Sequence, residues 1–114
     1  MDFFDNEMIR SEAAEMMQLY EDIQDLMVSY KFRSQEGGKE YLRMMERLLE
    51  LQEMIYFRAK YSDHTDAKEF VNMLMSTLPL VAKEGETDAS QVFRRMREEI
   101  SEMKKFAEDP WHHP

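Results

Sequence analysis

Residues Lys39 to Tyr61 read KEYLRMMERLLELQEMIYFRAKY and contain neither glycine nor proline. Leucine, methionine, arginine and glutamate dominate this segment, and all four residue types favour helix. Its apolar side chains recur along two helical faces, one at 4-3-4 spacing and one at 3-4-7 spacing. The first face comprises Met44, Leu48, Leu51 and Ile55, and the second comprises Leu42, Met45, Leu49 and Tyr56. Because a surface helix needs only one apolar face, two faces predict a central helix with neighbours on both sides.

The preceding segment predicts a second long helix, from residue 6 to about Tyr30, with Asp5 as its cap. Its apolar positions alternate at 4-3 spacing, which is typical of a coiled-coil seam. They are Ile9, Ala13, Met16, Tyr20, Ile23, Met27 and Tyr30. Lys31 to Gly38 is predicted to be a loop, because Gly37 and Gly38 disfavour helix and let the chain reverse. Two long helices joined by a short loop predict an antiparallel hairpin.

Two more helices are predicted after the central one. The third spans Ala67 to Leu78, and Pro79 is expected to end or kink it because proline lacks an N–H and clashes with the preceding turn. The fourth starts after Asp88, whose spacing to Gln91 resembles a capping box. The fold class is therefore all-α and bundle-like: an antiparallel hairpin of two long helices plus a shorter third and a fourth helix. Either these last two helices or a second copy of the chain would cover the second face of the central helix.

The length and composition limit the possible classes of protein. The 114 residues suit one domain, which we expect to span residues 1–107, followed by a Pro/Trp/His tail at 108–114. The absence of cysteine excludes disulfides and thiol chemistry. No signal-peptide pattern and no membrane-length apolar run is present, so we expect a cytoplasmic protein that does not enter membranes. Twelve methionines supply flexible apolar side chains that suit irregular cores and adaptable binding surfaces.

The acidic charge is concentrated near the N-terminus. The chain carries a net charge of −9, and residues 1–30 hold eight acidic residues and one basic residue. Direct contact with nucleic-acid phosphates is therefore disfavoured, and a protein with a basic surface is the natural partner. We predict that Glu15, Asp22 and Asp25 contribute to steering that partner.

The opening residues Phe3-Phe4-Asp5-Asn6-Glu7, the acidic first helix and the methionine-rich second helix ending near Arg58 form a recognisable combination. The chain resembles a small all-helical family of unknown function from cyanobacteria and the phages that infect them, over roughly residues 1–107. This resemblance implies the four-segment helical layout. It also suggests a regulatory role in infection or host physiology, and it brings no assigned activity.

Patterns for catalysis and metal binding are weak. A di-metal helical bundle needs Glu-x-x-His pairs on its helices, and none occurs on a predicted helix. Helical magnesium-dependent pyrophosphatases of nucleoside triphosphates pair Glu-x-x-Glu with a second acidic pair, which Glu50, Glu53, Asp63 and Asp66 superficially match. His112 and His113 lack convergent partners for zinc in the sequence. We expect no cofactor, no metal and no catalysis, with the pyrophosphatase kept as an alternative.

The remaining hypothesis is a non-catalytic interaction or regulatory protein, a homodimer that binds a larger cellular machine. Aromatic and methionine side chains are common anchors of such interfaces. The predicted contact residues are Leu42, Met45, Leu49, Tyr56, Phe57, Phe3, Phe4 and Trp111, together with the acids Glu15, Asp22 and Asp25. Phe3 and Phe4 have an alternative role as a staple of the first helix. A narrower alternative is an acidic DNA mimic that inhibits a nucleic-acid-binding protein, such as one of the transcription machinery.

Overall fold

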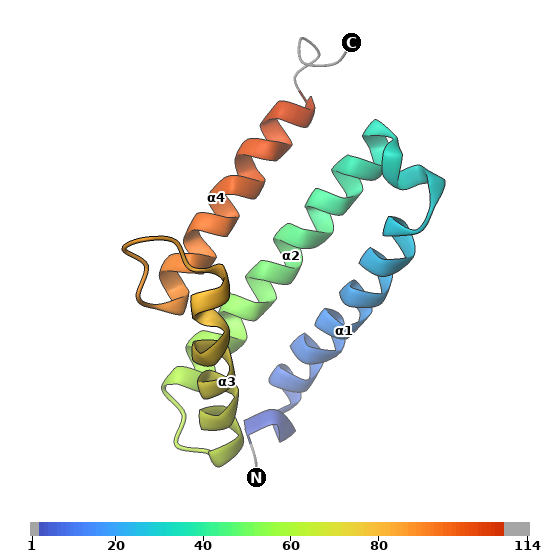
Figure 1. The fold of residues 1–114 in the computed structure, drawn as a ribbon. Coiled ribbons are helices and arrows are strands. Elements are labelled where there is room, and N and C mark those ends of the chain that lie inside the picture. The colour runs from blue at the N-terminus through green and yellow to red at the C-terminus, as the bar shows by residue number, and fades with distance from the viewer. Residues whose placement is uncertain (1–2, 109–114) are drawn as a thin grey trace.

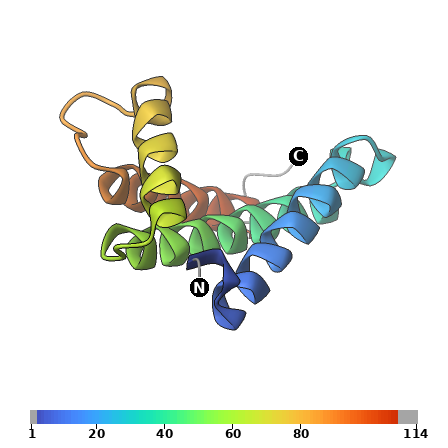
Figure 2. The same ribbon diagram turned by 90° about the horizontal axis from the view of Figure 1, so that it is seen from below.

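The computed structural model describes residues 3–108, and these residues form helices and connecting turns without a strand. The helices are η1 (Phe3–Asp5), α1 (Glu7–Met27), η2 (Tyr30–Arg33), α2 (Gln35–Lys60), α3 (Thr65–Val81) and α4 (Ala89–Glu108), where η marks a 3-10 helix. α1, α2 and α4 lie side by side with α2 in the middle (Figure 1). α3 rises from one face of this layer (Figure 2). The prediction of an all-α, bundle-like fold is confirmed.

α2 is the central helix, as its two apolar faces predicted. Its first face packs on α1 through Met44, Leu48 and Leu51, which contact Leu19, Ile23 and Leu26. Its second face packs on α4 through Leu49 and Tyr56, which contact Val92, Phe93 and Ile100. Leu51 and Ile55 are completely inaccessible to solvent. Each such side chain contributes about 1.5–3 kcal/mol to the free energy of unfolding.

One edge of the α2–α4 contact is a ladder of ion pairs. Glu46 pairs with Lys104 at 3.2 Å, and Glu53 pairs with Arg97 at 3.0 Å. The pairs are seven residues apart on both helices and run in opposite directions along the chain, as an antiparallel pair of helices requires. Exposed pairs of this kind contribute about 0.2–1 kcal/mol each, so they orient α4 more than they stabilise it.

The prediction of a loop from Lys31 to Gly38 is wrong. η2 occupies part of it, Ser34 caps α2, and both glycines lie in the first turns of α2. The hydroxyl of Ser34 accepts the N–H of Gly37 at 3.0 Å. A Cβ added to Gly37 would lie 1.7 Å from the carbonyl oxygen of Lys31, whereas a Cβ on Gly38 would meet nothing within 4 Å. Gly37 therefore lets η2 approach the start of α2 closely, and it does not break the helix.

The start of α1 differs from the prediction in its cap. Asn6, and not Asp5, caps the helix, because its side-chain oxygen accepts the N–H groups of Met8 and Ile9. The predicted seam holds at Ile9 and Ile23, but Tyr20, Met27 and Tyr30 are exposed while Leu19 and Leu26 are buried. A straight helix drifts about 20° per heptad against a strict seven-residue repeat. The face of α1 that meets α2 therefore shifts to the leucines.

The end of α3 and the start of α4 can both be compared with the predictions. α3 begins at Thr65 and continues through Pro79 to Val81, so of the predicted end or kink at Pro79, the end is wrong. A proline removes one intrahelical hydrogen bond, and the following turn is closed by the N–H of Ala82 donating to Leu78 at 2.8 Å. The capping box of α4 is confirmed, because the side chain of Gln91 accepts the N–H of Asp88 at 3.1 Å.

Candidate partner-binding surfaces

Two acids of α1 form ion pairs inside the chain. Arg47 donates to both oxygens of Glu15, at 2.6 and 2.9 Å, and Arg58 pairs with Glu12. The hydrogen bond from Arg47 holds the pKa of the Glu15 carboxyl below its ordinary value. Glu15 was predicted to face a partner, but it is held against α2 because Arg47 extends from the neighbouring helix. This pairing also shortens the acidic row that the DNA-mimic hypothesis needs.

Three acids in the C-terminal half of α1 face solvent. Glu21, Asp22 and Asp25 are exposed, and none of them forms an ion pair with another residue of the described range 3–108. Asp22 accepts a hydrogen bond from the side chain of Gln18 at 3.0 Å, which leaves its charge uncompensated. Val28, just past the end of α1, is 87% exposed next to these acids in the sequence. The C-terminal end of α1 thus combines uncompensated negative charge with exposed apolar surface.

The predicted contact residues of α2 lie in different environments. Leu49 and Tyr56 are buried in the chain's own core beneath α3 and α4, so they present no surface to a partner in this fold. The Tyr56 hydroxyl donates to Asp88 at 2.9 Å, and burial raises the pKa of Tyr56 to about 12. Leu42 and Met45 are half-buried. Phe57 is 41% exposed beside the Tyr56 ring.

Phe3 and Phe4 fasten the N-terminal segment to the bundle. Their N–H groups donate to the two carboxylate oxygens of Asp66, each at 3.0 Å. The Phe3 ring is buried, and the Phe4 ring meets the Phe70 ring edge-on at a centroid distance of 5.7 Å. The staple role of these phenylalanines therefore explains their positions. Trp111 lies outside the described residues.

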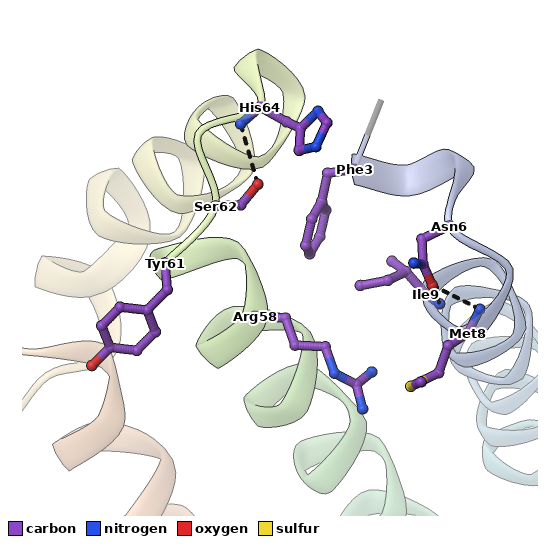
Figure 3. A pocket seen from close by; sticks show the side chains of 8 residues that line it. All are labelled: Phe3, Asn6, Met8, Ile9, Arg58, Tyr61, Ser62 and His64. Carbon is purple, nitrogen blue, oxygen red and sulfur yellow. Dashed lines mark hydrogen bonds between the residues drawn. The ribbon is translucent and has the colours of Figure 1, made fainter. Parts of the chain in front are cut away.

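A hollow of about 410 Å³ opens between the start of α1, the end of α2 and the turn before α3 (Figure 3). Phe3, Ile9, Arg58, Ser62 and His64 are among its lining side chains, and Arg58 points across it toward α1. The Ser62 hydroxyl accepts the main-chain N–H of His64 at 3.2 Å. This bond fixes the turn and does not couple the two side chains as a nucleophile and its base.

Three of the four acids of the pyrophosphatase alternative have separate partners. Glu50 pairs with Arg47 at 2.9 Å, Glu53 pairs with Arg97, and Asp66 binds the N–H groups of η1. Within the described part of the chain, no group of three or more His, Cys, Asp or Glu side chains is placed to hold a metal ion. His112 and His113 lie outside that part. The magnesium cluster that this chemistry requires is therefore not assembled from Glu50, Glu53, Asp63 and Asp66.

An apolar groove between α2 and α4 was not predicted from the sequence. It has a volume of about 210 Å³, and its apolar lining is Tyr41, Leu42, Met45, Met96, Ile100 and Met103, together with Leu49 at its floor. Met103 is 52% exposed. The partly buried Leu42 and Met45 belong to the second face of α2, and their contact with a partner stays a prediction. The signal in the sequence was methionine at three of the lining positions.

Comparison with known proteins identifies a family but no activity. Among residues 3–108, no helix has the length and apolar character that crossing a membrane requires. A search of curated proteins and a search of solved structures each find no match to this chain. A family model described as "Domain of unknown function (DUF1825)" matches residues 1–107, which include η1 and nearly all of α4. The chain therefore belongs to the DUF1825 family, whose function is unknown.

Proposed function

We propose that this chain is a non-catalytic interaction protein that binds a larger protein machine through a basic surface of that partner. The observation that carries the proposal is the division of the α1 acids. Glu12 and Glu15 are neutralised within the chain, whereas Glu21, Asp22 and Asp25 face solvent without ion pairs in the described range. Uncompensated like charges repel one another, and a basic partner would relieve that repulsion.

The proposal includes three further expectations. The working form is a homodimer, the protein acts in the cytoplasm, and its setting is the cyanobacterial or phage one that the sequence resemblance suggests. Val28 adds exposed apolar area next to these α1 acids in the sequence, which matches the mixture of apolar and polar contacts common in protein interfaces.

The test uses two triple variants with the same net charge. The first replaces Glu21, Asp22 and Asp25 with Lys, and the control replaces Glu69, Glu84 and Glu98, which are exposed on other elements, with Lys. A partner recovered with the wild-type chain from native lysate is then titrated against each chain by surface plasmon resonance over a range of salt concentrations.

We expect the α1 variant to associate several-fold more slowly at low salt, with a flatter salt dependence, because steering by charge acts mainly on the association rate. The control variant should keep most of the wild-type rate. Equal slowing by both variants would show that net charge alone matters. An unchanged rate in the α1 variant would refute the proposal, as would phosphate release from nucleoside triphosphates that requires Glu50.

A further inference from the structure

The first feature behind a further inference is an uncharged run in a highly charged chain. Residues 70–82 read FVNMLMSTLPLVA and contain no charged residue, although 34% of the chain is Asp, Glu, Lys or Arg. One face of this run packs on the core through Phe70, Val71, Leu74 and Leu78. The rest of it leaves apolar side chains in solvent that the intrachain packing does not explain.

These exposed side chains form what we call the α3 ridge, defined as Met73, Leu80 and Val81. They are 54%, 84% and 46% exposed, respectively. The hydroxyls of Ser76 and Thr77 between them donate to main-chain carbonyls of their own helix, at 2.7 and 2.8 Å. Because these hydroxyls already have acceptors, burying them against another surface costs less than burying free hydroxyls. The ridge is therefore suited to an apolar contact.

The second feature is the α2–α4 groove described above. Leu49 lines the groove and also belongs to the cluster against which α3 packs, so the groove lies next to the part of the α2–α4 contact that α3 covers. Lys83, two residues beyond α3, pairs at 3.0 Å with Glu99, which borders the groove. α3 itself rises from the layer of α1, α2 and α4 (Figure 2), so its exposed side chains project away from that layer.

The charge of the chain indicates which binding partner suits the α3 ridge and the α2–α4 groove. Two copies of a chain with net charge −9 repel each other, so they can approach closely only through surfaces without uncompensated acids. The α3 ridge has no charge, and Glu99 at the groove is compensated by Lys83 and by Arg95 at 3.0 Å. The outer face of α1, with Glu21, Asp22 and Asp25, would repel a second copy. A basic partner would gain nothing electrostatically from the ridge.

We propose that a second copy of this chain occupies the groove, with the α3 ridge of each copy lying in the α2–α4 groove of the other. A two-fold axis makes this arrangement self-consistent, because every ridge-to-groove contact occurs twice and closes the assembly at two copies. This inference specifies the surface of the homodimer included in the proposed function. It does not depend on the basic partner.

The first experiment is sedimentation equilibrium of the full chain across micromolar concentrations. We expect the wild type to be a dimer. Leu80→Glu on the ridge or Met103→Glu in the groove should raise the dissociation constant of the dimer at least ~10-fold, because either substitution buries an unpaired charge in the interface. Val28→Glu is the matched control, since it adds the same charge at a residue that is 87% exposed on α1. It should leave the dimer intact, and circular dichroism should show all chains folded.

The second experiment exploits the absence of cysteine from the chain. Leu80→Cys and Met103→Cys are made in separate chains, one of them tagged, then mixed and mildly oxidised. The proposal predicts disulfide-linked pairs that contain one chain of each kind. The double variant Leu80→Glu/Met103→Lys should recover dimerisation relative to Leu80→Glu alone, because each introduced glutamate then meets a lysine across the interface.

The outcomes separate the two ideas. A monomeric wild type at every concentration would overturn the homodimer and with it this interface, while the test of α1 steering would still stand. A wild-type dimer that is insensitive to both glutamate substitutions would overturn the ridge-to-groove arrangement alone. Crosslinks that join only position 80 to position 80 would do the same.

Discussion

Arg47 of α2 donates two parallel hydrogen bonds to Glu15 of α1, Nε to Oε2 at 2.6 Å and Nη2 to Oε1 at 2.9 Å. Bidentate geometry of this kind is the strongest form of carboxylate recognition by arginine. The pair joins the two helices of the hairpin at its edge. It also neutralises one acid of the surface that the sequence predicted for a partner.

Replacing Glu15 with Gln should lower the free energy of unfolding by about 0.5 kcal/mol at neutral pH, since both side chains remain partly exposed and screened. Asp25→Asn is the control and should change little. Because Arg47 lowers the pKa of Glu15 in the folded chain, this stabilisation is present above the ordinary value of 4.5 and is lost as the pH falls through the lowered value. Urea unfolding at neutral and acidic pH checks both statements. A gap between wild type and Glu15→Gln that grows toward acid would contradict them.

The two neighbouring glycines of α2 should respond oppositely to alanine. Gly37→Ala places a methyl group against the carbonyl oxygen of Lys31 and should cost at least about 1–3 kcal/mol through displacement of η2. Gly38→Ala meets open space and should stabilise the chain by about 0.5–1 kcal/mol, because alanine favours helix over glycine. Thermal unfolding of the two variants is the measurement. If both alanines stabilise the chain, the close approach of η2 to α2 is wrong.

Asp66→Asn should loosen the N-terminal segment, because an amide oxygen and an amide NH₂ cannot together accept the N–H groups of Phe3 and Phe4 as the carboxylate does. The expected result is a lower melting temperature and faster hydrogen exchange at the amides of Phe3 and Phe4. Asp63→Asn, three residues earlier in the exposed turn, is the matched control. Unchanged exchange at these two amides would remove Asp66 as their anchor.

Tyr56→Phe should lower the free energy of unfolding by about 1 kcal/mol, because it deletes the hydrogen bond to Asp88 and keeps the ring. Burial raises the pKa of Tyr56 to about 12, so its stabilisation is fully present below the ordinary value of 10 and is lost as the pH rises through 12. Subtracting the alkaline absorbance titration of Tyr56→Phe from that of the wild type should show one phenol whose pKa lies above the ordinary value. A phenol that ionises near 10 in this difference would contradict its burial.

Several features of the fold could be predicted because their causes are local or periodic. The two apolar faces of Lys39 to Tyr61 establish α2 as central wherever its neighbours lie, since apolar side chains on both sides must be covered. The capping box of Asp88 and Gln91 involves residues within one helical turn, so sequence spacing is enough to predict it.

The candidate surfaces depended on contacts between distant segments. Glu15 and Asp25 are indistinguishable in the sequence as acids of one helix, yet only Glu15 meets an arginine 32 positions away. Leu49 and Leu42 share one predicted face, yet α3 covers the region around Leu49 and leaves the groove beside Leu42 open. The exposed ridge on α3 could not be predicted from the sequence, because its apolar composition is the same as that of a core helix.

The sequence by itself determined the all-α class, the central place of α2 and the acidic character of α1, because composition and periodicity within a helix do not change on folding. Tertiary structure alone decided the role of Gly37, whose missing Cβ matters only because Lys31 lies against it. It also decided which of Leu19 and Tyr20 is buried, and which acids remain uncompensated. Those outcomes depend on the angle and distance at which helices meet, and packing between segments far apart in the chain determines both.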